Sequence, residues 1–82
     1  MILVDIYVPS MNQGYDFRLE QNAVISSVID ELVEVISQKE KCSLIGDQEK
    51  LSLCSYERQT ILPKKNTLAE CGIHTGSKLM LV

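Results

Sequence analysis

A change in the spacing of apolar residues near residue 22 constrains the fold of this chain more than any other feature. Up to residue 20, apolar residues recur at every second position, which is typical of strands with one buried face. After residue 22 they recur at three and four positions, which is the spacing of one helical stripe. That stripe consists of Ile25, Val28, Ile29, Leu32 and Ile36. The helix therefore has one apolar side to bury, and we expect a sheet to supply the surface that covers it.

The segment before the helix predicts a β-hairpin. In residues 2–8 the β-branched positions that share one side are Ile2, Val4, Ile6 and Val8. Pro9 cannot donate to a ladder and ends this strand. Residues 10–14 have the composition of a turn. Residues 15–20 alternate again and form the second strand, whose inward side chains are Tyr15, Phe17 and Leu19.

We expect Asn22 to be the N-cap of the helix, because its side chain can accept a hydrogen bond from the first turn. The helix should end near residue 40, and residues 43–49 should form a loop. Beyond it, strands are expected at residues 50–56, with Leu51 and Leu53 inward, and around residues 60–62.

The last twenty residues predict a turn followed by a strand. Residues 67–72 should form one short helical turn, with Thr67 as its N-cap and Gly72 as its left-handed stop. Residues 78–82 are expected to be the final strand, with Leu79 and Leu81 facing inward.

This order of elements predicts an α+β fold in a single domain that spans residues 1–82. The first and last strands are the most apolar, so we place them side by side at the centre of the sheet. The result is a β-grasp: a mixed sheet in the order second, first, fifth, third and fourth strand, packed on one main α-helix.

Size and charge exclude several functional classes. A chain of 82 residues with net charge −3 lacks the basic stripe of a general nucleic-acid binder, and it is too small for a deep cleft between lobes. No apolar run reaches the roughly 18 residues that insertion into a membrane requires. The apolar start of the chain has no basic region before it and so is no signal peptide. We expect a cytoplasmic protein.

Catalytic and metal-binding residues are not indicated either. Cys42, Cys54 and Cys71 form no CxxC unit, and His74 is the only histidine, so a zinc site would lack ligands. Cys71 and His74 flank a turn but have no orienting third group, so they do not make a nucleophile and base pair. We read Cys71 as a small apolar side chain beneath the turn. The sequence predicts no enzyme, no metal and no cofactor.

Three short motifs resemble those of a known family. They are Val28-Ile29-Asp30, Leu68-Ala69-Glu70-Cys71-Gly72-Ile73 and Gly76-Ser77-Lys78-Leu79. Together with the order of elements, they resemble the YukD-like proteins of type VII secretion systems, within the ubiquitin-like superfamily. The resemblance implies a ubiquitin-like β-grasp fold. It also implies a non-enzymatic accessory or adaptor protein that docks onto protein components of a bacterial secretion apparatus.

Conjugated modifiers and sulfur carriers of this fold end in Gly-Gly, whereas this sequence ends at Val82 in a predicted strand. We therefore expect docking and not conjugation. The alternative is a generic ubiquitin-like interaction module of another assembly, which could be a homodimer.

The predicted docking surface is the side of the sheet that faces away from the helix, which ubiquitin-like domains commonly use for partners. In the expected strand order the outward residues Leu3 and Tyr7 lie beside Met80 and Val82, with Cys54 or Ser52 next to them. A large apolar patch without a cover is uncommon on a soluble monomer and marks an interaction site. The alternative is that these are separate exposed apolar residues, which are normal on any surface.

Overall fold

A computed structural model gives the fold, and it describes residues 1–40 and 51–82. Within these ranges the elements are β1 (Ile2–Val8), β2 (Gln13–Leu19), α1 (Ile25–Glu40), β3 (Leu53–Ser55), β4 (Thr60–Ile61) and β5 (Lys78–Leu81). Strands and helix follow the predicted order. The expected strand at residues 50–56 is shorter than predicted, and the expected loop at 43–49 lies outside the described residues, as does Cys42.

The strands form one mixed sheet in the order β2-β1-β5-β3-β4. β1 runs antiparallel to β2 and parallel to β5, while β3 is antiparallel to both β5 and β4. The first and last strands are thus neighbours in the middle of the sheet, as their apolar composition predicted. The predicted α+β β-grasp architecture is confirmed.

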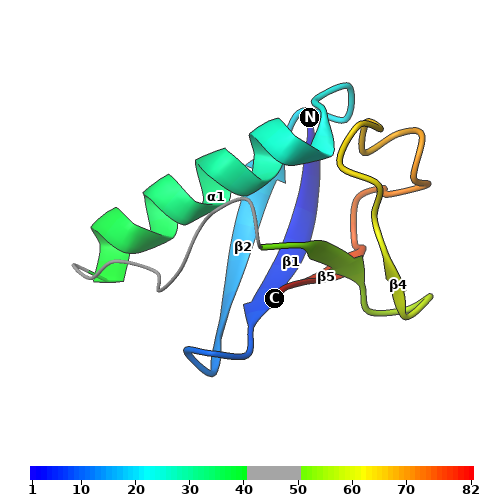
Figure 1. The fold of residues 1–82 in the computed structure, drawn as a ribbon. Coiled ribbons are helices and arrows are strands. Elements are labelled where there is room, and N and C mark those ends of the chain that lie inside the picture. The colour runs from blue at the N-terminus through cyan, green and yellow to red at the C-terminus, as the bar shows by residue number, and fades with distance from the viewer. Residues whose placement is uncertain (41–50) are drawn as a thin grey trace.

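Helix α1 crosses one face of this sheet (Figure 1), and the core lies between the two layers. The alternation of β1 is complete, because every second residue from Ile2 to Val8 is buried. Ile6, Leu32 and Leu53 are fully buried and come from β1, α1 and β3. Leu68 and Ile73, from the segment before β5, are buried as well and close one end of the core.

The predicted N-cap of α1 is wrong. The helix begins at Ile25, three residues after Asn22, and the Val28 amide donates to the carbonyl of Val24. Amides of the first turn, which have no acceptor within the helix, donate to a different segment of the chain. The Ile25 amide donates to the Asn66 carbonyl at 2.8 Å, and the Ser26 amide donates to the Lys64 carbonyl at 3.1 Å. Tertiary contacts therefore replace the side-chain cap that the sequence indicated.

The predicted cap at Thr67 is confirmed. The Glu70 amide donates to Thr67 Oγ1 at 3.1 Å, and the Thr67 amide donates to Glu70 Oε1 at 2.8 Å, which makes a reciprocal capping box. Gly72 ends the segment with φ of +75°, the left-handed conformation expected of it. The segment itself is a series of turns and not a helix.

Candidate protein-interaction surface

The outer face of the sheet, the side away from α1, carries a row of apolar side chains across four strands. Tyr7 of β1 pairs with Met80 of β5, Met80 pairs with Cys54 of β3, and Cys54 pairs with Ile61 of β4. We call these residues the apolar row. Tyr7 is 40% and Ile61 67% exposed, while Cys54 and Met80 are half-buried between them. Adjacent strands of a sheet lie about 4.8 Å apart, so the row forms a continuous strip.

The two ends of the apolar row differ: a hydrogen bond holds Tyr7 at the β1 end, and a depression lies at the β4 end. The Tyr7 hydroxyl donates to Asn12 Oδ1 at 2.7 Å, which ties the ring to the β1–β2 turn. At the β4 end lies a depression of about 400 Å³, which we call the apolar depression. It is lined by Cys54, Ser55, Tyr56, Gln59, Thr60, Ile61 and Met80. This end of the strip could receive an apolar side chain.

The structure brings together most of the residues predicted for this surface, with one correction. Tyr7, Cys54 and Met80 are paired neighbours. Val82 directly follows β5, two residues after Met80, and is 46% exposed. Its backbone exchanges two hydrogen bonds with Ser52. Leu3 does not lie beside Met80 and Val82, contrary to prediction. Its carbonyl accepts from the Gly76 amide at 2.9 Å, because the parallel register of β1 and β5 places it two rows away.

Two residues of this surface were missed from the sequence. Ile61 belongs to a predicted strand, but a strand of two residues is too short for alternation to assign its face. The structure buries the next residue, Leu62, and alternation from that residue places Ile61 outward. Tyr56 follows β3 and is 58% exposed, and its amide donates to the Lys78 carbonyl.

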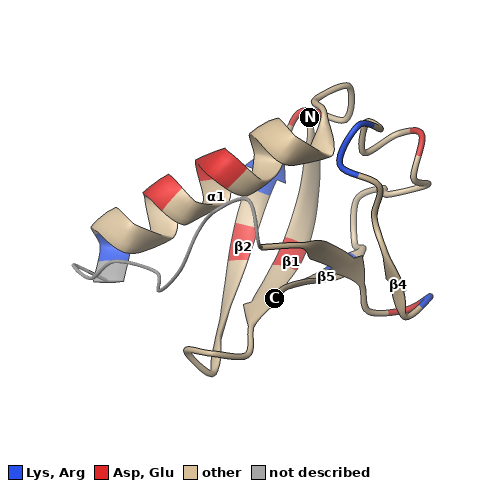
Figure 2. Cartoon of the chain, viewed as in Figure 1, with Lys and Arg blue, Asp and Glu red and all other residues tan. Residues whose placement is uncertain are grey.

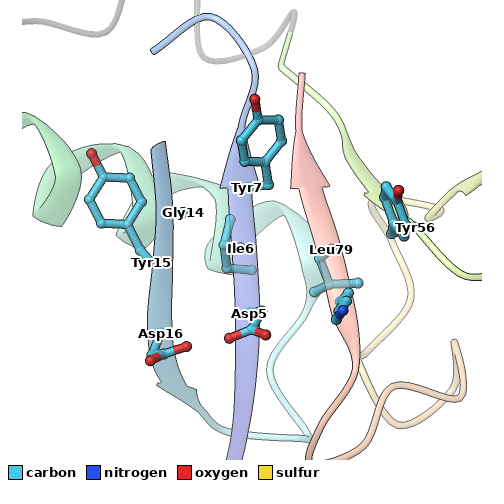
Figure 3. Close-up of a pocket in the computed structure, with 9 residues that line it drawn as sticks. Asp5, Ile6, Tyr7, Gly14, Tyr15, Asp16, Tyr56 and Leu79 are labelled. Atoms are coloured by element: carbon cyan, nitrogen blue, oxygen red, sulfur yellow. The ribbon is translucent and has the colours of Figure 1, made fainter. Parts of the chain in front are cut away.

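A charged row lies beside the apolar row. Asp16 of β2 pairs directly with Asp5 of β1, and Asp5 pairs with Lys78 of β5. The two acidic positions lie side by side on the sheet (Figure 2), and their carboxyl groups face each other in Figure 3. A hydrogen bond and charge repulsion from Asp5 raise the pKa of Asp16, with smaller contributions from burial and, in the opposite direction, from Lys39.

These three charged residues form part of the lining of a second depression, of about 330 Å³, which we call the acidic depression. The residues that line it are shown in Figure 3: Asp5, Ile6, Tyr7, Gly14, Tyr15, Asp16, Tyr56, Lys78 and Leu79. Gly14 stands opposite Tyr7 and has no side chain, so the sheet is open at this point.

The described residues include two free thiols, those of Cys54 and Cys71, and both side chains are half-buried. Burial, reinforced by Glu70 and opposed by Arg58, raises the pKa of the Cys71 thiol, so it is protonated at neutral pH. Cys71 packs against the core, as its reading as a small apolar side chain predicted. Over residues 1–40 and 51–82, His, Cys, Asp and Glu form no group of three that could hold a metal ion. No helix in the same ranges is long and apolar enough to cross a membrane.

Comparison with solved structures gives the class of protein. The EccD5 ubiquitin-like domain from Mycobacterium xenopi matches with a TM-score of 0.77 and 23% identity, over 99% of this chain and 91% of that one. A ubiquitin-like domain from Arabidopsis thaliana matches with a TM-score of 0.73 and 17% identity, over 99% and 74% of the two chains. Ubiquitin from Caldiarchaeum subterraneum matches at 0.70 and 16%, over 98% and 89%. The fold is that of a ubiquitin-like domain.

The sequence then gives the family. The family described as "WXG100 protein secretion system (Wss), protein YukD" matches residues 3–81, and the chain belongs to this family. The resemblance drawn from the three motifs is confirmed. A search among curated proteins finds none that matches.

Proposed function

We propose that this protein is a non-enzymatic, cytoplasmic accessory protein of a type VII secretion system that docks onto another component of the apparatus and is not conjugated. Membership of the YukD family supports the secretion role, and ubiquitin-like domains are generally non-catalytic. The observation that carries the docking mechanism is the apolar row on the face opposite α1. Such a strip is a surface from which binding to a partner would remove water.

The experiment is capture of partners from a native lysate with membranes, under reducing conditions, followed by mass spectrometry. Wild-type protein should recover secretion components without covalent adducts. Ile61→Lys places a charge at the β4 end of the apolar row, in the lining of the apolar depression, and we expect it to reduce recovery at least tenfold, a cost of about 1.4 kcal/mol or more.

Val35→Lys is the matched control. Val35 is a β-branched residue that is 40% exposed, but it lies on α1 and not on the outer face. It should leave recovery unchanged, and both variants should melt cooperatively. Equal recovery by the two variants would refute the docking surface, and a ladder of covalent adducts would refute docking as the mechanism.

A further inference from the structure

The two depressions of the outer face have one wall in common. Tyr56 lines both the acidic depression and the apolar depression, and it is 58% exposed. A ligand that covers this tyrosine therefore meets a charged hollow on one side and an apolar hollow on the other. The acidic depression presents charged groups and the apolar depression presents apolar side chains, so a ligand that fills both must carry a charged group and an apolar group.

The acidic depression has the chemistry of a site for a planar cation. Two carboxylates, Asp5 and Asp16, stand directly opposite one another, and one ammonium, Lys78, lines the same hollow. Like charges placed opposite each other destabilise a sheet, and sequences break such local rules mainly at functional sites. Lys78 is paired with Asp5, and Asp5 still raises the pKa of Asp16 through a hydrogen bond and charge repulsion.

Aromatic rings border this hollow. Tyr7 and Tyr56 both line it, and the face of a tyrosine ring attracts cations. A guanidinium can donate to two carboxylates in one plane and can stack on a ring, whereas an ammonium does neither as well. The lining therefore favours an arginine side chain.

We propose that the outer face binds a partner segment that sets an arginine over Asp5 and Asp16 and a large apolar side chain between Met80 and Ile61. This inference rests on the proposed function and names the chemistry of its partner. The arginine position lies between β1 and β2 and the apolar position lies over β3, which is two and a half strand spacings away, about 12 Å. The two positions are also two residues apart along the strands, about 7 Å, so the full distance is about 14 Å. Two residues seven apart on a helix are separated by about 10 Å, since the rise is about 1.5 Å per residue, and the long arginine side chain spans the remaining distance.

The same geometry predicts that the affinity for the arginine depends on pH, because Asp16 takes up a proton at low pH. A bound guanidinium favours the ionised form of Asp16, so binding opposes the rise in pKa that Asp5 causes. Affinity should therefore fall as the pH is lowered through the raised pKa of Asp16. Asp5 of β1 is the group directly opposite Asp16, Lys78 of β5 is opposite Asp5, and the charge of Lys39 on α1 lowers the pKa of Asp16 by a smaller amount.

The test is a nuclear magnetic resonance titration of the full chain with a synthetic peptide. The probe is an acetylated, amidated helix of alanine and glutamine that carries one arginine and, seven residues later, one leucine. Chemical-shift changes are expected at Asp5, Asp16 and Tyr7, and also at Ile61. D5N/D16N should weaken binding about fivefold or more, which is the upper range for exposed ion pairs.

The matched control is D30N/E34Q, which removes two negative charges from exposed positions of α1 and should change affinity less than twofold. A probe with arginine replaced by glutamine should bind about as weakly to wild-type protein as the original probe binds to D5N/D16N. Equal affinity for D5N/D16N and wild-type protein, shift changes confined to α1, or no binding would overturn the inference.

The same variants separate this inference from the proposed function. A secretion component that binds D5N/D16N as tightly as wild-type protein leaves the docking role standing and overturns the arginine site. Binding of the probe through Asp5 and Asp16, without capture of any secretion component, supports the site chemistry and refutes the secretion role. Self-association in sedimentation that D5N/D16N abolishes would make a second copy the occupant and would overturn the inference.

Discussion

The titration of Asp16 follows from the register of two strands. Asp16 lies directly across from Asp5, and their hydrogen bond and repulsion raise its pKa above the ordinary 3.8. The folded state therefore holds this proton more tightly than the unfolded state. The resulting stabilisation is fully present below pH 3.8 and is lost as the pH rises through the raised pKa. At neutral pH the pair destabilises the fold.

Asp16→Asn should accordingly raise the urea midpoint at pH 7 and low salt, and should leave it unchanged at pH 3. Asp30→Asn removes the same charge from an exposed position of α1 and serves as the control. Asp30→Asn should not raise the urea midpoint at pH 7 while leaving it unchanged at pH 3. A gain of equal size at both pH values would contradict the repulsion between the two aspartates.

Gly72 and Gly76 both adopt left-handed conformations, with φ of +75° and +94°. A Cβ at Gly72 would lie 2.9 Å from Nη2 of Arg58, whereas a Cβ at Gly76 would meet no atom within 4 Å. Because Nη2 is the end of a long side chain, it can move away, and the backbone conformation sets the cost at both positions. We expect Gly72→Ala and Gly76→Ala each to lower the free energy of unfolding by about 1–2 kcal/mol.

Chemical denaturation of each variant, with and without Arg58→Ala, checks this expectation. Arg58→Ala removes the predicted contact, together with the 3.4 Å hydrogen bond from Arg58 to the Cys71 carbonyl. A Gly72→Ala cost that greatly exceeds the Gly76→Ala cost, and that Arg58→Ala relieves, would show that Arg58 is held rigidly instead.

At the scale of elements, the start of α1 depends on a segment forty residues away in the sequence. Its first amides donate to the carbonyls of Asn66 and Lys64, and the capping box at Thr67 and Glu70 begins immediately after them. The same region adds an isolated bridge between Val24 and Thr67. The helix end and the turn therefore support one another.

Thr67→Ala removes the hydroxyl of the capping box, and we expect it to destabilise the protein by about 1 kcal/mol. Because the turn holds the carbonyls that cap α1, hydrogen exchange at the Ile25 and Ser26 amides should also become faster. Thr67→Ser keeps the hydroxyl and should behave as wild type. Asn22→Ala should cost less than about 0.5 kcal/mol, since Asn22 is not the N-cap. A loss of about 1 kcal/mol in Asn22→Ala would show that Asn22 caps α1, as the sequence indicated.

At the scale of the whole molecule, the two faces of the sheet have different roles. One face packs against α1 and holds the core, while the described residues of the other leave apolar side chains exposed to solvent. Stability should therefore depend on residues such as Ile6, and binding on residues such as Ile61. The two properties can be changed separately.

Ile6→Ala and Ile61→Ala make the same chemical change on the two faces. Ile6 is 0% exposed and Ile61 is 67% exposed. We expect Ile6→Ala to cost about 2–5 kcal/mol of unfolding free energy and Ile61→Ala to cost less than about 0.5 kcal/mol. Calorimetry or denaturant unfolding measures both. A large loss of stability in Ile61→Ala would mean that this residue serves the core and is no candidate for docking.

Most of the fold could be predicted because short-range periodicity decides it. Each strand or helix has one buried side, and the spacing of apolar residues identifies that side directly. The central position of β1 and β5 followed from their apolar composition. The candidate surface was predicted less completely, because its outline depends on which residues of different strands are paired. Alternation places Leu3 on the outer face, but only the register shows that it lies apart from Met80.

The sequence by itself determined the order of elements, the inward side of β1, β2, β3 and β5, the cap at Thr67 and the family to which the chain belongs. Only the tertiary structure decided how α1 begins, which apolar residues form one row, and that Asp5 and Asp16 face each other. The physical reason is the range of the interactions. Periodicity and capping act within a few residues, whereas these three features arise where segments far apart in the chain meet.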